Sequence, residues 1–586
     1  MRFLVVGLFL FGLLGCQAVF RDDSSSDYDM ESESVSEENP VYSEQIEKKV
    51  QERLQILKNN GGEGEDTYNT YKSVCIVDGQ PKLLDMFDCR KQVAVGRWQN
   101  SINSTGWSYL EVETFVGNDE DLQAYSAGYL EGTLSKNVIE YHLQNTYYTY
   151  CDGFKAYCRR LGSYLRKNFD YIKRKVESAP KDDVYWQAVR RAFFQLTGVW
   201  DGFQQNKFEA NMLFEVTPIY LININGELYD LEKKFNKTKD PLTINEKCSG
   251  FVKVAPNNAD LFISQVTMSG FQNLLRVLKL YKFGYESQLF AGQTTTFSSY
   301  PGMLYSSDDF ALTSAGLAVI ETTISVWNNS IFEKIDPEHQ LHTWVRAVVS
   351  NQLARSGREW CEIYSRHNSG TYNNQWVVLD YKRFQPYKTL PDYGLLYVLE
   401  QLPGKIVFGD QSQLLKKQTY YASYNIPFYK EISTMSGFDK KGQEFYWFSW
   451  NNCPRANIFR RDHNNVHDLD SLTTLMRYND FKHEEFSRSE AAISARGDLN
   501  QKNGSYPLPG MGFVNHGALD YKGTNYELFK QLRFRAIGSP SYENVPAFQW
   551  SASGLKQTVK HVGHPDLWKF KAVERKWETP NVKANL

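Results

Sequence analysis

Two stretches of the chain place an apolar residue at every third or fourth position, the spacing of one face of a helix. In Cys158–Val176 the apolar positions alternate with lysines and arginines. The apolar positions there are Leu161, Tyr164, Leu165, Phe169 and Ile172. We predict an amphipathic helix whose cations form a solvated face rather than a nucleic-acid patch. Residues 184–203 carry a second apolar stripe and are predicted to be helical, and residues 106–144 favour strands followed by a helix.

Beyond residue 247 the pattern changes to that of strands. Residues 250–254 and 261–266 are short β-type runs separated by the turn-rich stretch 255–260, which predicts a hairpin. Phe271, Leu274, Leu275 and Leu278 then recur at helical spacing, so we expect a helix packed on the hairpin. Residues 233–247 are polar and are predicted to form an exposed, cleavable loop. Cys248 therefore begins a strand directly after a loop.

The first residues have the pattern of an export signal. Arg2 is followed by an apolar run over 3–15 and by a small-residue cleavage site after Ala18, which predicts a signal peptide over 1–18. Leu13–Cys16 also resembles a bacterial lipobox, which is the alternative. Residues 19–70 form an acidic, serine-rich segment that we expect to be disordered over 21–48, with a short helix near 45–57. The folded part is expected to begin near Tyr71.

Composition and simple motifs argue against a nucleic-acid partner and bound the class of protein. The 586 residues carry a formal net charge of −2, so no basic excess exists to neutralise nucleic-acid phosphates. A hydrophobic content of 41% is enough for a large core, in several domains or in one large α+β domain. No second apolar run is long enough to cross a bilayer. N-x-S/T sequons, which fit a secretory route, occur at Asn103, Asn236, Asn328 and Asn503.

Cysteine arithmetic points to an unpaired thiol. Seven cysteines remain after the signal peptide: Cys75, Cys89, Cys151, Cys158, Cys248, Cys361 and Cys453. In an oxidising compartment an odd count leaves at least one without a partner in the chain. Cys151 and Cys158 close a short loop and are our predicted disulfide. The spare thiol is either reactive or a buried small hydrophobe.

The position of Cys248 offers a chemical role. If the Lys247–Cys248 bond is cut, the new α-amine, with a reference pKa of about 7.7–8.0, can act as the general base for its own thiol. The sequence does not carry the motifs of other common enzyme classes, since the chain contains no GxSxG, HExxH, Walker or GxGxxG motif. His463 and His467 could suggest a metal site, but their charged neighbours favour a hydrogen-bonded network. Asp308 and Asp309 are adjacent, so their side chains point apart and do not make an acid dyad.

Several ordered blocks, from about residue 105 to the C-terminus, resemble the phospholipase B-like family. In the larger C-terminal part they are Cys248–Val254, Leu274–Arg276, Phe297–Gly302, Asp308–Phe310, Glu321–Thr323, Asn368–Gln375, Val378–Asp380, Glu400–Pro403, Ser423–Phe428, Arg455–Asp462 and Leu475–Phe481. Upstream they are Tyr185–Trp186, Gln195–Leu196 and Asp201–Gly202.

The resemblance implies an α+β fold, a four-layer αββα sandwich of the N-terminal-nucleophile hydrolase type. It implies a smaller chain over 71–247 and a larger chain over 248–586 that stay associated after cleavage, and it is compatible with a homodimer. It implies a secreted or lysosomal glycoprotein that removes acyl groups from phospholipids or related lipids, with no metal and no organic cofactor.

Within this resemblance Cys248 is the nucleophile and its freed amine the base. Thr323 and Asn373 or Asn374 are the candidates for orienting the amine and holding the oxyanion. For the Asn pair, the alternative is a turn whose side chains bond their own backbone.

One segment departs from the family pattern of Ser-His-x-Thr-Trp, because this chain has Gln265 and Met268 there, two residues expected to line the site. Glutamine hydrogen-bonds but does not titrate near neutral pH. Three functions therefore stay open: a phospholipid acyl hydrolase, an amidase acting on N-acyl compounds or peptides, or a binding glycoprotein that has lost turnover.

Overall fold

The computed structural model describes residues 68–237, 248–286, 288–307, 310–486, 491–506 and 512–586. The predicted signal peptide, the acidic segment over 19–67, the short helix near 45–57, Asp308–Asp309 and the stretch 238–247 lie outside the described residues. The first described strand begins at Thr70.

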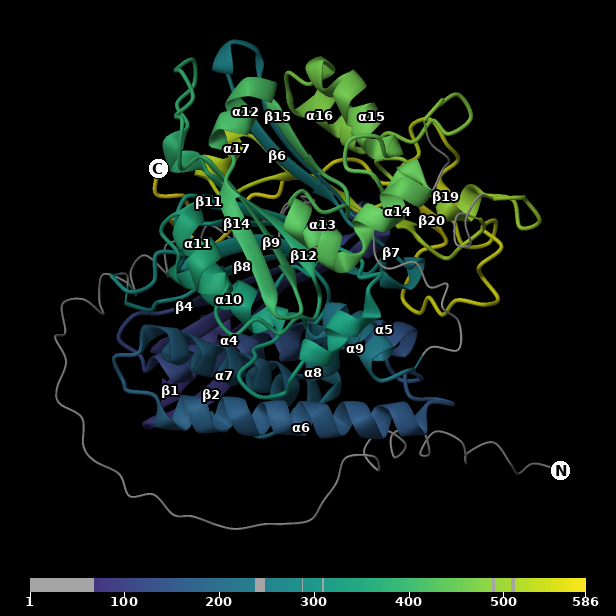
Figure 1. Ribbon diagram of the computed structural model, residues 1–586. Coiled ribbons are helices and arrows are strands. Elements are labelled where there is room, and N and C mark those ends of the chain that lie inside the picture. Colours follow the sequence, from purple (N-terminus) through teal and green to yellow (C-terminus); the bar gives the residue numbers. More distant parts are fainter. Residues whose placement is uncertain (1–67, 238–247, 287, 308–309, 487–490, 507–511) are drawn as a thin grey trace.

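A large sheet runs through the middle of the molecule (Figure 1). In spatial order it contains β14 (Lys405–Asp410), β13 (Leu396–Leu402), β12 (Asn374–Asp380), β11 (Leu317–Thr323), β10 (Phe310–Thr313), β9 (Thr294–Ser299), β8 (Arg276–Lys282), β4 (Trp107–Thr114), β3 (Gln92–Ser101), β1 (Thr70–Val77) and β2 (Gln80–Asp85). Neighbours are antiparallel except β4 and β8, which pair in parallel from Trp107↔Arg276 to Glu113↔Lys282. Strands from both sides of residue 247 thus belong to the same large sheet.

A smaller antiparallel sheet carries the start of the predicted larger chain. Its strands, in order, are β15 (Tyr420–Ser423), β5 (Ser249–Val254), β6 (Leu261–Val266), β17 (Tyr521–Thr524) and β18 (Arg535–Ile537). Two further strand pairs are β7 (Met268–Ser269) with β16 (Gly517–Ala518), and β19 (Phe548–Gln549) with β20 (Leu567–Trp568). The predicted hairpin is confirmed as β5 and β6, which pair from Ser249↔Val266 to Val254↔Leu261.

The two sheets face each other across an apolar core. β11 of the large sheet contacts both β5 and β6. The inward residues are fully buried, among them Val252, Ile263, Ile320 and Val377. Alternation along β5 sends Phe251 to the opposite face, where its ring stacks on Phe459 at 5.0 Å. Phe459 belongs to α15 (Pro454–Asp462), and α16 (Leu469–Met476) also packs on this outer face.

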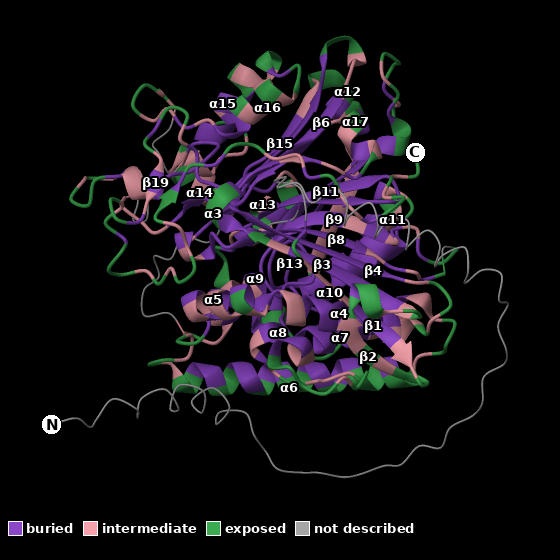
Figure 2. Ribbon diagram, turned by 180° about the vertical axis from the view of Figure 1, so that it is seen from behind, coloured by how far each residue is buried: buried purple, intermediate pink, exposed green. Residues whose placement is uncertain are grey.

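Helices cover the other face of the large sheet. α4 (Glu120–Leu134) packs on β3 and β4, and α7 (Val184–Gln204) packs on α4. The two helices approach so closely that a Cβ on Gly128 would lie 1.9 Å from Gln195 O, which only glycine permits. α6 (Lys155–Ser178) lies outermost, with its charged side exposed (Figure 2). The predicted helices over 158–176 and 184–203 are confirmed.

The remaining described helices are shorter, and among them α11 packs across β12, β13 and β14. They are α3 (Ile102–Thr105), α5 (Lys136–Thr146), α8 (Pro218–Asn223), α9 (Asn225–Lys234), α10 (Thr343–Leu353), α11 (Gly357–Tyr364), α12 (Ser412–Gln418), α13 (Lys430–Ser436), α14 (Phe438–Glu444) and α17 (Tyr526–Lys530).

The helix predicted from Phe271 to Leu278 is wrong. Phe271–Asn273 is a single 3-10 turn, and β8 begins at Arg276. Arg276–Lys282 is buried on both faces, and its pairing with β4 on one side and β9 on the other makes it a strand. Periodicity alone does not distinguish a short apolar run in a buried strand from one in a helix, so tertiary pairing decides between them.

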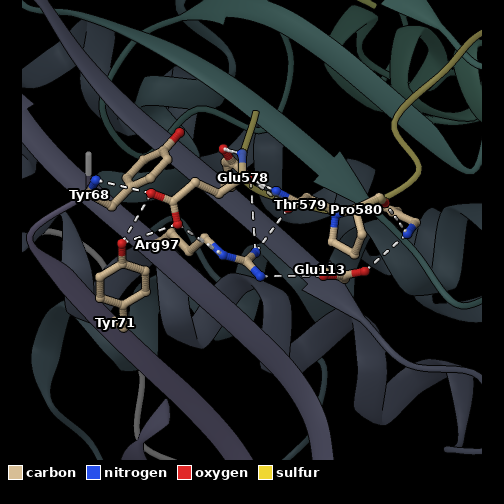
Figure 3. A network of polar contacts seen from close by, with 9 residues as sticks. Tyr68, Tyr71, Arg97, Glu113, Glu578, Thr579 and Pro580 are labelled. Carbon is tan, nitrogen blue, oxygen red and sulfur yellow. Dashed lines mark hydrogen bonds and ion pairs between the residues drawn. The ribbon is translucent and has the colours of Figure 1, made fainter. Parts of the chain in front are cut away.

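The C-terminal segment returns across the first strands of the chain (Figure 3). The buried Glu111 accepts hydrogen bonds from Glu578 N and Thr579 N, each at 2.7 Å. Arg97 Nη1 donates to Thr579 Oγ1 at 2.9 Å, and Tyr71 OH donates to Glu578 Oε1 at 3.1 Å. These contacts fasten the end of the chain to β1, β3 and β4.

Two disulfides are present among the described residues. Cys151 pairs with Cys158, which confirms the predicted bridge, and Cys75 pairs with Cys89, which the sequence analysis did not assign. Both bridges lie on the N-terminal side of residue 247. Cys248, Cys361 and Cys453 are buried and form no disulfide within the described part of the chain.

Candidate active site

Cys248 lies immediately before β5, with no exposed surface. By strand alternation Cys248 and Gly250 point to the face of β5 that meets the large sheet. A Cβ on Gly250 would lie 3.0 Å from Ile320 Cδ1 and 3.7 Å from Thr322 Cγ2, which confirms that this face looks onto β11. The candidate nucleophile therefore sits at the end of the space between the two sheets.

The backbone of Cys248 is held from both sides by distant side chains. Asn425 Oδ1 accepts a hydrogen bond from Cys248 N at 3.1 Å. Arg455 Nη1 donates to Cys248 O at 2.5 Å and to Ser249 Oγ at 3.2 Å. Arg455 Nη2 donates to Asn425 Oδ1 at 2.8 Å and to Tyr424 O at 2.7 Å. The guanidinium thus fixes both the nucleophile and the residue that binds its nitrogen.

Asn425 has an unusual backbone that explains how it reaches Cys248. It follows β15, the neighbour of β5, and its φ of +68° is in the left-handed region, which asparagine adopts more readily than most residues. Its amide nitrogen donates to Thr323 O at 2.8 Å, and its backbone N donates to Thr322 Oγ1 at 3.3 Å. The Oδ1 atom is therefore held toward Cys248.

Thr323 takes part in the site through its carbonyl oxygen. Its hydroxyl is buried and has no hydrogen-bond partner in the described part of the chain. The neighbouring Thr322 is the threonine that faces β5, where its Oγ1 lies 2.7 Å from Ser423 Oγ. Thr323 therefore reaches Cys248 only through its carbonyl and Asn425, and its role in orienting the amine stays a prediction.

The Asn373 and Asn374 side chains are engaged elsewhere. Asn373 Nδ2 donates to Asp230 Oδ2 and to Gly370 O, both at 3.0 Å. The neighbours of the Asn374 side chain favour the orientation in which its amide nitrogen faces acceptors. In that orientation the nitrogen donates to Asn373 O at 3.0 Å and to Glu321 Oε2 at 3.2 Å. Because the side-chain nitrogens of both asparagines already donate to other groups, this geometry does not favour the predicted oxyanion role. The buried Asn373 Oδ1 has no partner among the described residues and can only accept.

Asp230 connects the smaller predicted chain to this cluster. It lies on α9, and burial raises its pKa to about 6, although hydrogen bonds from the Asn373 and Tyr372 region oppose the shift. α9 packs tightly here, because a Cβ on Gly226 would lie 2.3 Å from the Tyr372 ring. Tyr372 OH in turn donates to Glu321 Oε1 at 2.9 Å.

Gln265 and Met268, the predicted site-lining pair, separate in the structure. Gln265 lies on β6 opposite Gly250, on the face shared with Cys248, and is fully buried. Met268 is buried in β7, where it pairs with Ala518. Of the two, only Gln265 has a register position that faces the space between the sheets next to the nucleophile.

The thiols of Cys361 and Cys453 lack an activating environment. Burial raises the pKa of Cys453 to about 11, and burial likewise raises the pKa of Cys361. A thiol with a raised pKa is a poor nucleophile at neutral or acidic pH. Burial lowers the pKa of Arg455, while the sulfurs of Cys453 and Cys248 act in the opposite direction, so its charge lies close enough to Cys248 to interact.

The four sequon asparagines Asn103, Asn236, Asn328 and Asn503 are all exposed. Their exposure gives the accessibility that glycosylation needs, and glycosylation itself stays a prediction. Among the described residues no helix is long and apolar enough to cross a membrane.

Comparison with known proteins places the chain in a family. The family model described as Phospholipase B matches residues 94–575. The chain is 58% identical over 535 residues to "Putative phospholipase B-like 2" of Caenorhabditis elegans, covering 89% of this chain and 92% of that protein. It is 39% identical over 528 residues to the human protein of the same name, covering 86% and 89%.

The chain belongs to the phospholipase B-like family. The similarity extends to "Phospholipase B-like protein A" of Dictyostelium discoideum, with 34% identity over 514 residues, 82% of this chain and 87% of that protein. The matched region includes Cys248, Asn425 and Arg455. The blocks that contain Asn425 and Arg455 resemble the family in sequence, but nothing in them indicates contact with a cysteine 177 and 207 positions away.

Proposed function

We propose that this phospholipase B-like protein is an acyl hydrolase of the N-terminal-nucleophile type, acting on phospholipids or related acylated lipids. Cleavage before Cys248 creates its catalytic amine. The observation that carries the proposal is the hydrogen bond from Cys248 N to Asn425 Oδ1, with Arg455 bound to the carbonyl of the same residue. A site that binds the nitrogen of a strand-opening cysteine suits a nitrogen that becomes an α-amine.

Maturation begins with attack of Cys248 Sγ on the carbonyl carbon of Lys247. The C–N bond breaks as the C–S bond forms, and the proton from sulfur ends on the nitrogen. Water then hydrolyses the thioester, which frees the Lys247 carboxylate and the Cys248 α-amine and thiol. Asn425 Oδ1 can accept from this nitrogen before and after cleavage, so the site needs no rearrangement.

Lipid hydrolysis repeats the same chemistry on an exogenous ester. The α-amine takes the thiol proton, Sγ attacks the acyl carbon, and the alcohol leaves with the proton from the ammonium. Water attacks the thioester to release the fatty acid. The cationic Arg455 stabilises the thiolate electrostatically and holds the nitrogen-binding Asn425 in place.

The architecture supports the association of the two chains. β4 and β8 lie on opposite sides of the cleavage point and form adjacent strands of one sheet. The C-terminal residues Glu578 and Thr579 bind Glu111 of β4. The order of helices, large sheet, small sheet and helices is what the proposed αββα sandwich requires. A secreted or lysosomal location, inferred from the signal peptide and the sequons, belongs to the same proposal.

N-terminal sequencing of the purified protein, combined with hydrolysis assays, tests the proposal. We expect a fragment beginning at Cys248, and loss of both cleavage and phospholipid hydrolysis in Cys248→Ala. Cys361→Ala removes another buried thiol and is the matched control, which should cleave and hydrolyse normally. An uncut wild-type chain, or undiminished hydrolysis in Cys248→Ala, refutes the mechanism. Faster turnover of a matched amide than of the ester shifts the substrate class to N-acyl compounds.

A further inference from the structure

Gln265 carries a buried hydrogen-bond donor with no acceptor. The residue has no exposed surface, and its Nε2 makes no hydrogen bond within the described part of the chain. Unpaired donors of this kind are rare in folded proteins and costly to bury, so each calls for an explanation. A group that receives its acceptor only when substrate binds is one such explanation.

The strand register places this donor beside the nucleophile. Ser249 pairs with Val266 and Gly250 with Gln265, so the register extended by one residue sets Cys248 opposite Thr267. Cys248, Thr267 and Gln265 therefore share the face between the sheets. Diagonal neighbours in an antiparallel pair are about 7–8 Å apart, within reach of a long side chain. Gly250, directly across from Gln265, has no side chain to stand between them.

A chain of hydrogen bonds fixes which way the Gln265 amide faces. Lys522 Nζ donates to Thr267 Oγ1 at 2.6 Å and to Asp520 Oδ1 at 2.6 Å. Because Thr267 Oγ1 accepts from Lys522, its own proton goes to Gln265 Oε1, at 3.2 Å. The oxygen end of the amide is thereby occupied, and the nitrogen end is left as the outward donor. All of these residues are buried.

We propose that Gln265 Nε2 is the oxyanion donor of the hydrolase, oriented by Thr267 and Lys522. This inference rests on the proposed function. As Cys248 Sγ bonds to the acyl carbon, the carbonyl π pair moves onto oxygen, and Gln265 Nε2 donates a hydrogen bond to that oxygen. When the alcohol leaves, the pair returns and the thioester forms. An amide does not titrate in this range, so the donor works unchanged from neutral to acidic pH.

The test compares Gln265→Met, which keeps the length but removes the donor, with the wild-type protein. Active sites are counted as the larger fragments beginning at Cys248, so that kcat refers to matured enzyme. We expect kcat to fall by about 10²–10³-fold, the effect of removing one oxyanion donor, with KM changed less than about threefold. Ser264→Ala is the matched control, because Ser264 is buried on the opposite face of the same strand and should keep full kcat.

A second readout separates catalysis from structure. Gln265→His restores a donor that titrates, so it should recover part of kcat and acquire a pH dependence near the ordinary histidine pKa of about 6.5, absent from wild type. Should Gln265→Met fail to fold or mature, Thr267→Val replaces it, with Thr267→Ser as the conservative partner. Thr267→Val should lower kcat at least about tenfold, and Thr267→Ser should restore it.

Failure of this inference differs from failure of the proposed function. If wild type is cleaved and active and Cys248→Ala is dead, the proposed function stands. Unchanged kcat in Gln265→Met or Thr267→Val then overturns the oxyanion role alone. An equal loss in Ser264→Ala also overturns it, because the effect is then a general one of the strand. If wild type itself lacks hydrolysis, both proposals fall together.

Discussion

At the scale of single residues, the site depends on two side chains far from Cys248 in the sequence. Asn425 and Arg455 lie 177 and 207 positions away and together hold its nitrogen and its carbonyl. Their hydrogen bonds to one another make them a unit, so removing either should disturb the other. Arg455 in particular shares its two terminal nitrogens among four acceptors.

Asn425→Gly should slow cleavage before Cys248 at least about tenfold, because it removes the acceptor for the nucleophile's nitrogen at a cost of about 1 kcal/mol or more. Glycine keeps the left-handed backbone without strain. Asn425→Ala should slow cleavage equally and destabilise the fold by a further 1–2 kcal/mol or so. A time course of fragment formation, with thermal unfolding, checks both. Cleavage of Asn425→Gly at the wild-type rate contradicts the assigned role.

Arg455→Lys keeps the charge but should not rescue the site. Lysine cannot reproduce the planar fork that binds Cys248 O and Asn425 Oδ1 together. We expect cleavage to fall nearly as far in Arg455→Lys as in Arg455→Met, and stability to fall by about 2–4 kcal/mol in both. The exposed Arg358, which pairs with Glu362, is the matched position, and Arg358→Lys should behave as wild type. Full cleavage in Arg455→Lys would show that charge alone suffices.

The position of Cys248 at the start of a strand could be predicted because its sequence signal is local. A cysteine that opens a strand after a polar loop is visible in a window of 20 residues, as is the short Cys151–Cys158 loop. Asn425 and Arg455 lack such a signal, because their roles arise from the pairing of β15 with β5 and the packing of α15 on the small sheet. The contacts of the Asn373 and Asn374 side chains with Asp230 and Glu321 also arise from tertiary packing and have no local signal, and the oxyanion role of the two asparagines stays a prediction.

At the scale of elements, α9 joins the smaller predicted chain to the site. Gly226 of α9 lies against the Tyr372 ring. Asp230 of the same helix accepts a hydrogen bond from Asn373, the residue that follows Tyr372. Period-based prediction found long elements such as α6 and α7 and the β5–β6 hairpin. It failed at Phe271–Leu278, because a short apolar run buried on both faces carries no strand period, and pairing with β4 and β9 made the strand.

Gly226→Ala should displace the Tyr372 ring and disturb the contact between Asp230 and Asn373. The added methyl would lie 2.3 Å from ring carbons, so the ring or the helix must move. We expect a loss of about 1–3 kcal/mol in the free energy of unfolding, together with slower cleavage. Thermal unfolding and fragment analysis measure the two effects. Wild-type values for both would show that α9 adjusts freely and does not constrain the site.

At the scale of the whole molecule, the proposed cleavage would leave one sheet shared by two chains. Both described disulfides lie before residue 247, so within the described residues no disulfide crosses the proposed cut. The parallel pairing of β4 with β8 and the contacts of Glu111 with Glu578 and Thr579 hold the pieces without covalent bonds. The fragments should co-elute in native buffer and separate in denaturant without reductant. Separation in native buffer would contradict the shared sheet.

Three buried carboxyl groups make the stability of the whole molecule pH-dependent. Burial raises the pKa of Glu227 to about 8, of Glu400 to about 7 and of Asp230 to about 6. Each folded-state value lies above the unfolded value of about 4, so the folded state binds more protons and gains stability as pH falls from about 8 toward 4. Burial lowers the pKa of His142 and His342 to about 3, which removes stability as pH falls below about 6.5.

Because the three carboxyl groups, and not His142 or His342, act between pH 8 and 6.5, the midpoint of thermal unfolding should rise as pH falls through that range and level off or decline below it. Glu227→Gln removes the group with the highest pKa and keeps an oxygen for Thr343 N, which donates to Glu227 Oε1 at 2.6 Å. The variant should gain stability relative to wild type at pH 8 more than at pH 5, which flattens the profile. The exposed Glu338→Gln should leave the profile unchanged. A wild-type midpoint that is constant or falls from pH 8 to 6.5 would show that these carboxyl groups are ionised in the folded protein.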